Sequence, residues 1–152
     1  MKPNPEYIDY IRKLVRESPF PQLMTMRLDA MHLDTATVVI DLNSSHLQPF
    51  GLVHGGVMAT LIDTATFWAA YMRIPEDAGL VNVDIKLNYL KSITSGVLRA
   101  EGVAIKSGRS LSYAEARVYD EQETLLVHGT STLMALPGKG LKAPMPKFLL
   151  PD

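Results

Sequence analysis

The chain has 152 residues, 47% hydrophobic and 20% charged, which fits one globular domain with a core of its own. Its formal net charge of −1 gives no electrostatic reason to expect a nucleic acid or an anionic membrane as a partner. The absence of cysteine excludes disulfides, a thiolate nucleophile and a cysteine-based metal site, and favours a cytoplasmic protein.

The first third of the chain predicts one helix, two strands and a loop. Apolar residues recur at helical spacing over about residues 5–17, and the proline-rich run at 18–21 ends this helix. Residues 27–33 and 36–42 predict two strands joined by a tight turn. Proline and glycine mark residues 43–52 as a loop.

Residues 57–72 form an almost unbroken apolar stretch that contains one carboxylate, Asp63. The triad His54-Gly55-Gly56 precedes it, and we expect a buried helix over about residues 55–73. The stretch is too short to span a bilayer, which needs ~20 apolar residues. Residues 1–10 lack the apolar centre of a signal peptide, so we expect no association with a membrane.

The second half of the chain predicts strands only. Apolar and polar residues alternate strictly over residues 81–89, which predicts a strand with one buried face. The apolar members of this alternation are Val81, Val83, Ile85, Leu87 and Tyr89. Turn signals separate three further strands, expected at 97–106, 110–120 and 124–136.

Small residues occupy one face of two of these strands. They are Ala100, Gly102, Ala104, Ser112, Ala114 and Ala116. Such a surface lets a bulky element lie close to the sheet, and the apolar helix must be covered on most sides. Together these requirements predict an α+β fold in which a curved antiparallel sheet wraps round one long helix. The proline-rich tail at 137–152 is expected to be extended, and residues 1–152 to form a single domain.

Asp63 and the two glycines suggest an acid and an oxyanion site. A lone acid in apolar surroundings is costly to bury unless it is paired, hydrogen-bonded or used chemically. Gly55 and Gly56 leave approachable backbone N–H groups where the helix begins. Simpler alternatives are an Asp63 that only stabilises the fold and glycines that only allow a tight helix entry. For His54 we favour a role in orienting the loop over a role as a base.

The spacing of these groups has a geometric consequence. Eight residues separate Gly55 from Asp63, which is ~12 Å along a helix. One acyl carbon cannot lie within ~3 Å of both groups. Two antiparallel helices ~8–10 Å apart would bring Gly55 of one chain near Asp63 of the other, twice. The catalytic hypothesis therefore predicts a two-fold homodimer with two sites across its interface.

Two further segments are candidates for substrate binding. Gln48, in the loop before the helix, could donate to a thioester oxygen or hold a water, or be an ordinary loop residue. Lys106, Ser107, Gly108, Arg109 and Ser110 form a basic hairpin turn, which could grip phosphates or only aid solubility. No zinc spacing, serine-hydrolase elbow or phosphate-binding loop is present, and we expect no metal.

The chain resembles the hotdog-fold acyl-CoA thioesterases, in particular the PaaI-like family, which includes enzymes of the phenylacetate pathway. The resemblance lies in the run Gln48-x6-Gly55-Gly56-x6-Asp63, the strand at 82–89, the hairpin at 106–109 and the segment 127–131. It covers about residues 20–136.

The resemblance implies hydrolysis of an aryl- or medium-chain acyl-CoA thioester. Asp63 matches the acid that acts as general base or nucleophile in this family. The Gly55 N–H matches the group that polarises the thioester carbonyl, and Gln48 matches a position that helps to place the nucleophilic water. Coenzyme A would be part of the substrate, and we expect no separate cofactor.

The resemblance also suggests contacts to the substrate and an assembly. His54, Gly56 and Asn82 are expected to contact it, although Asn82 stands where several relatives have serine or threonine. The phosphates of coenzyme A would lie near residues 106–110. We expect a homodimer that pairs into a dimer of dimers.

Three other functions stay open. Hotdog dehydratases use a histidine and an acid, which His54 and Asp63 supply, but the spacing and the double glycine fit that group poorly. A non-catalytic acyl-CoA sensor would keep the fold and the pocket, but such sensors usually carry a DNA-binding segment, and no basic helix-turn-helix signal occurs. A purely structural dimerisation module would not need the buried acid.

Overall fold

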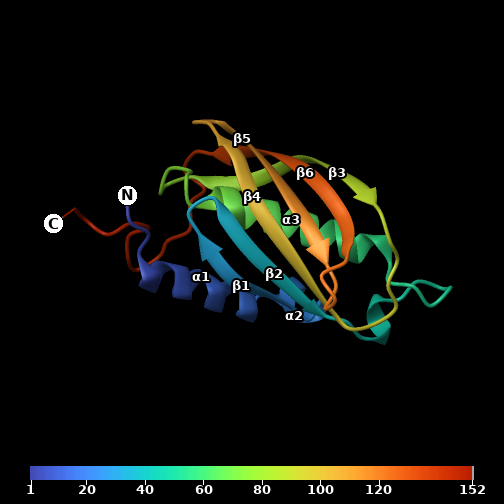
Figure 1. Ribbon diagram of the computed structural model, residues 1–152. Helices are drawn as coiled ribbons and strands as arrows, with labels where there is room; N and C mark the ends of the chain where they lie inside the picture. The colour runs from blue at the N-terminus through green and yellow to red at the C-terminus, as the bar shows by residue number, and fades with distance from the viewer. Residues whose placement is uncertain (152) are drawn as a thin grey trace.

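A six-stranded antiparallel sheet curves around one long helix, α3 (Gly55–Tyr71), in the computed structural model, which describes residues 1–151 (Figure 1). Across the sheet the strands follow the order β1-β2-β4-β5-β6-β3. Their bounds are Met26–His32 (β1), Thr35–Asp41 (β2), Gly79–Tyr89 (β3), Val97–Ser107 (β4), Leu111–Tyr119 (β5) and Leu125–Leu136 (β6). The predicted α+β architecture is confirmed, and the long helix and all six strands lie where the sequence predicts them.

Small residues on β4 and β5 let α3 lie close to the sheet. Ala100, Ala114 and Ala116 are fully buried. A Cβ atom on Gly102 would lie 2.2 Å from the carbonyl oxygen of Ala65, so only glycine fits at this point. The close approach expected from the sequence is confirmed.

Strand β3 departs from the predicted alternation. Its pairing with β6 shifts between Asn82 and Asp84, which makes Val83 the extra residue of a β-bulge. Asn82 therefore faces α3 before the bulge, and Ile85 faces it after the bulge. The prediction that Val81 and Val83 share one buried face with Ile85 is wrong, and Val83 is 57% exposed. β3 is also an edge strand, with a neighbour on one side only.

Two helices precede the sheet, α1 (Pro5–Glu17), as predicted, and the short α2 (Pro19–Leu23), which the sequence did not predict. Pro19 takes the first position of α2, where its missing N–H would be unpaired in any case. α1 lies along the other edge strand, β1 (Figure 1). There Arg12 Nε donates to the carbonyl oxygen of Leu28 at 3.2 Å.

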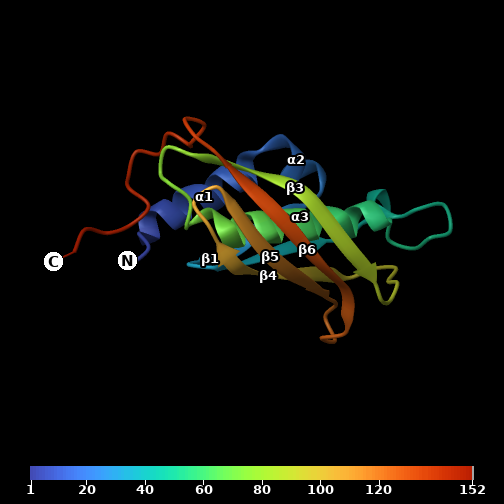
Figure 2. The same cartoon turned by 90° about the horizontal axis from the view of Figure 1, so that it is seen from above.

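The tail after β6 returns to the start of α1, so the two termini lie side by side (Figure 2). Lys147 in this tail is 1% exposed, and its Nζ donates to the carbonyl oxygens of Tyr71 and Ile74 at 3.2 Å each. These contacts place a cation at the negative end of the α3 dipole. Residues 137–151 contain no helix or strand and include turns and bends. None of the helices within residues 1–151 is long and apolar enough to cross a membrane.

Candidate active site

The N-terminus of α3 presents a free backbone donor. Nδ1 of His54 accepts the Gly56 N–H at 2.7 Å and caps the helix, which places the proton of the neutral ring on Nε2. The Gly55 N–H, at the first helical position, has no acceptor among residues 1–151. His54 thus orients the helix entry, and the Gly55 N–H is left for an incoming oxygen.

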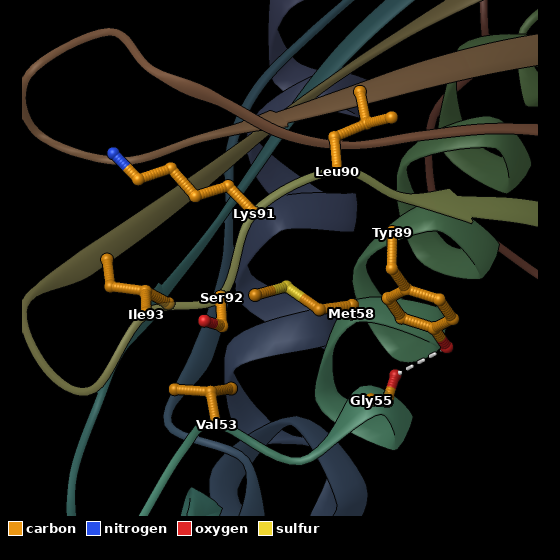
Figure 3. A pocket seen from close by; sticks show the side chains of 8 residues that line it. All are labelled: Val53, Gly55, Met58, Tyr89, Leu90, Lys91, Ser92 and Ile93. Atoms are coloured by element: carbon orange, nitrogen blue, oxygen red, sulfur yellow. Dashed lines mark hydrogen bonds between the residues drawn. The ribbon is translucent and has the colours of Figure 1, made fainter.

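A cavity of about 420 Å³ opens beside this N-terminus (Figure 3). Its lining consists of Val53, Gly55, Met58, Tyr89, Leu90, Lys91, Ser92 and Ile93. The Tyr89 hydroxyl donates to the Gly55 carbonyl oxygen at 3.1 Å, and a Cβ atom on Gly55 would lie 3.2 Å from this hydroxyl. The sequence did not single out Tyr89 as a site residue. The only hint in the sequence is that Tyr89 carries a hydroxyl, whereas the other apolar positions of the alternating strand are aliphatic.

Asp63 lies half-buried in the middle of α3 and has no partner. Its carboxylate makes no hydrogen bond or ion pair within residues 1–151, and burial alone raises its pKa. It lines a crevice of about 340 Å³ together with Phe20 of α2, Thr60 of α3 and Ile85 of β3. A partly desolvated carboxylate beside open space is suited to accept a proton. In the described part of the chain, no cluster of three or more histidine or acidic side chains could hold a metal ion.

Asn82 holds β3 against α3. Its Nδ2 donates to Ser131 Oγ at 2.8 Å and to the main-chain oxygen of Asp63 at 3.3 Å. These bonds fix the backbone at the third turn of α3. They also engage the amide within the fold, so the expected contact of Asn82 with the substrate stays a prediction.

Gln48 lies in a loop that hydrogen bonds hold in one conformation. Its Oε1 accepts the Phe50 N–H, and its carbonyl oxygen accepts the Gly51 N–H at 2.9 Å. His46 is buried, and both of its ring nitrogens bond to backbone groups. The loop projects beyond the N-terminal end of α3 (Figure 2), with Phe50 88% exposed at its tip. The Nε2 of Gln48 has no acceptor among the described residues and is free to donate.

The basic hairpin, residues 106–110, joins β4 and β5 at the other end of α3 (Figure 1). All five residues are exposed, and Arg109 and Ser110 line a crevice of about 240 Å³ with Pro75, which follows α3. Within one chain the length of α3 separates this hairpin from Gly55 by ~24 Å. A single protomer therefore does not bring the predicted oxyanion donor, acid and phosphate-binding turn together.

Comparison with known proteins decides the family. The family model described as the thioesterase superfamily matches residues 50–127, just over half of the chain. The chain belongs to the thioesterase superfamily. The matched range holds Gly55, Asp63, Asn82 and the basic hairpin, whereas α1, α2 and the tail lie outside it.

Curated relatives in the thioesterase superfamily are about one third identical to this chain. ComA2 of Bacillus subtilis is 30% identical over 104 residues, which are 68% of this chain and 82% of that protein. The 1,4-dihydroxy-2-naphthoyl-CoA hydrolase of Listeria monocytogenes is 33% identical over 98 residues, 64% of this chain and 80% of the hydrolase. The proofreading thioesterase EntH of Cronobacter sakazakii is 31% identical over 87 residues, 57% of this chain and 62% of EntH.

Solved structures from the thioesterase superfamily share the fold. A thioesterase from Haemophilus influenzae superimposes with a TM-score of 0.79 at 23% identity, covering 90% of this chain and 94% of the other. A thioesterase family protein from Silicibacter pomeroyi gives a TM-score of 0.77 at 26% identity, covering 84% and 96%. The hotdog fold and the family expected from the sequence are confirmed.

Proposed function

We propose that this protein hydrolyses acyl-CoA thioesters with an aryl or medium-chain acyl group. The observation that carries the proposal is Asp63, the one charged residue of α3, whose carboxylate has no hydrogen-bond or ion-pair partner among residues 1–151 and lies beside open space. Among the relatives, the 1,4-dihydroxy-2-naphthoyl-CoA hydrolase and the thioesterase EntH support this reaction class, and the hydrolase also supports an aryl-CoA as a substrate.

The proposed reaction uses donors and acceptors from two copies of the chain. The Gly55 N–H and the positive end of the α3 dipole stabilise negative charge on the thioester carbonyl oxygen. The partner's Asp63 takes a proton from water as the water oxygen bonds to the carbonyl carbon, and Gln48 positions that water. The intermediate then breaks its C–S bond, and the leaving sulfur receives the proton from Asp63. The products are free coenzyme A and a carboxylic acid.

In a variant of this mechanism, Asp63 attacks the carbonyl carbon directly. The thiolate leaves, a mixed anhydride forms on the carboxylate, and water opens it in a second step. Both routes need the same placement of Asp63 and Gly55. The raised pKa of Asp63 suits both routes, because it makes the carboxylate a stronger base and also a stronger nucleophile.

The free edge of β3 supports the two-fold assembly. Backbone groups along this edge have no strand partner, and such edges attract another strand. Antiparallel pairing of two β3 strands would set two α3 helices side by side, so that Gly55 of each approaches Asp63 of the other. The crevice at Asp63 adjoins Ile85 of this strand. The same pairing brings the partner's basic hairpin, residues 106–110, toward the Gly55 end, where the phosphates of coenzyme A would need it.

A dimer of dimers is the second part of the proposed assembly. The outer face of the sheet carries exposed apolar side chains near the basic hairpin. They are Val103, Ile105, Leu111, Tyr113 and Met134. Contiguous exposed apolar residues support packing between copies. We also propose a cytoplasmic location, since the cysteine-free sequence favours a reducing compartment.

The test is release of free thiol from a panel of acyl-CoAs that vary in chain length and aryl character. We expect turnover of some members, and Asp63→Asn should lower it by about 100-fold or more, as for loss of a catalytic base. Asp9→Asn on the exposed face of α1 is the matched control and should match the wild type. Full activity of Asp63→Asn would reject the assignment. A wild-type protein inert on the whole panel would favour the sensor, and consumption of a hydroxyacyl-CoA without thiol release would favour the dehydratase.

A further inference from the structure

An apolar slot runs along α3 from Asp63 toward the end of the helix. Two adjoining cavities form it, one of about 230 Å³ that contains Asp63 and one of about 310 Å³ farther along. They share four lining residues, so they lie next to each other along α3. The shared residues are Val15, Ser18, Phe67 and Trp68. Asp63 thus lies at one end of a row of two neighbouring hollows.

The walls of the slot are aromatic and aliphatic. The rings of Phe67 and Trp68 meet edge to face with centroids 4.8 Å apart, and Trp68 meets Tyr71 in the same way at 5.0 Å. Both Phe67 and Trp68 remain half-buried, although the α3 residues that face the sheet are fully buried. Apart from Asp63, the only charged residue in the lining is Lys139 at the far end. This lining suits an uncharged hydrocarbon group.

The lining of the second cavity includes residues from segments outside the matched thioesterase region. Leu14 on α1 and Leu141 in the tail both line the second cavity. The slot between Asp63 and Tyr71 follows eight residues of helix, ~12 Å, which is the length of a medium acyl chain in extended form. Leu14 and Leu141 are absent from the lining of the Asp63 cavity, so a group that enters at Asp63 meets them only when it extends past Phe67 and Trp68.

We propose that this slot binds the acyl chain of the substrate, and that Leu14 and Leu141 set the greatest chain length it accepts. The inference rests on the proposed function, because Asp63 marks the end where the thioester carbonyl would lie. The N-terminal helix and the tail thereby become determinants of specificity. Short acyl groups would stay in the first cavity, where α1 contributes Val15, and would not reach Leu14 or Leu141.

The single tryptophan of the chain allows a test that needs no catalysis. Alkyl-CoA thioethers, which cannot be hydrolysed, are titrated while Trp68 emission is recorded. Decyl-CoA should change the intensity and wavelength of the emission at saturation, because its chain would lie against the indole. Ethyl-CoA, with a chain too short to reach Trp68, should change it little.

Leu14→Phe then tests the far end, with Lys13→Phe on the exposed side of α1 as the control. The extra volume should lower kcat/KM for decanoyl-CoA by about tenfold or more and leave acetyl-CoA and butyryl-CoA within about twofold. Lys13→Phe should change none of these values. Circular dichroism of both variants establishes that they are folded.

The outcomes separate this inference from the proposed function. If thioesters are hydrolysed but Leu14→Phe lowers all chain lengths equally, or decyl-CoA leaves Trp68 emission unchanged, the slot does not hold the acyl chain. A second copy that fills the slot would give this last result. If no thioester is hydrolysed while decyl-CoA still perturbs Trp68 and ethyl-CoA does not, the slot binds acyl groups and the hydrolytic function is wrong.

Discussion

Replacing Lys147 with methionine should abolish a rise in stability at alkaline pH. Burial lowers the pKa of this amine from 10.5 to about 8, against a small opposing effect of Glu76. In the unfolded chain the pKa stays at its ordinary value. Above pH 8 the unfolded state therefore binds more protons than the native state, and the free energy of unfolding rises with pH. At 1.36 kcal/mol per pKa unit, this lysine contributes a rise of about 2 kcal/mol between pH 8 and about 10.

Two neighbouring tyrosines limit the pH range in which this effect is seen. Burial raises the pKa of both Tyr7 and Tyr71, whose hydroxyls share a hydrogen bond of 3.0 Å next to Lys147. A group with a raised pKa stabilises the native state below its unfolded pKa and loses that contribution as pH rises through it. The tyrosines therefore begin to oppose the lysine near pH 10, and the measurement should stop there.

The assay is urea unfolding at fixed protein concentration over a series of pH values from 7 to about 10, followed by circular dichroism. The difference in unfolding free energy between the wild type and Lys147→Met should grow by about 2 kcal/mol over this range. Lys13→Met, which removes an exposed lysine of α1, should run parallel to the wild type. Equal pH dependence of the wild type and Lys147→Met would refute the reasoning, because it would mean that the amine titrates normally in the native state.

Three further changes test the fold, the assembly and the acid. Gly102→Ala places a Cβ atom 2.2 Å from the Ala65 carbonyl oxygen and should lower the free energy of unfolding by about 3 kcal/mol or more. Urea unfolding measures this change, and an unchanged free energy would mean that α3 can shift away from the sheet without cost. Val83→Lys on the free edge of β3 should convert the proposed dimer to a monomer in sedimentation and abolish the proposed thioesterase activity, whereas Leu150→Lys in the exposed tail should do neither. Because burial raises the pKa of Asp63 above 3.8, kcat/KM should begin to fall on acidification at a higher pH than an ordinary aspartate would give, in the range where circular dichroism shows a folded protein. A midpoint at 3.8 would contradict that assignment.

The local pattern of apolar, polar and small residues in the sequence predicted the helices and strands whose residues repeat at a regular spacing. The apolar stretch at 57–72 predicted α3, and the small residues around Gly102 predicted how closely it lies to the sheet. The bulge in β3 left no such trace, because the alternation of apolar and polar residues continues through Val83 although the pairing with β6 shifts there. In the sequence, Pro19 predicts only the end of the first helix. Proline is equally compatible with the first turn of a helix, and Pro19 begins α2.

In the candidate site, too, the residues marked by a local sequence pattern could be predicted, and those that depend on long-range packing could not. Gly55 and Asp63 could be found because glycines at a helix start and a lone acid in an apolar run are visible in sequence. Tyr89 could not, since its hydroxyl reaches Gly55 only through the packing of β3 on α3. Lys147 is another case, because the carbonyl groups that it satisfies are set by the end of a helix more than seventy residues earlier in the chain.

The helix that covers β1 has a consequence for how many chains can join. Arg12 satisfies a carbonyl group of this strand, and α1 lies along it, so one margin of the sheet is closed to further strands. Only the opposite edge, β3, is open to a strand of another chain, and in the proposed dimer the two β3 edges would pair with each other. Growth of the sheet into fibres through its edges would then stop at two chains, and the proposed dimer of dimers would form through the sheet faces instead.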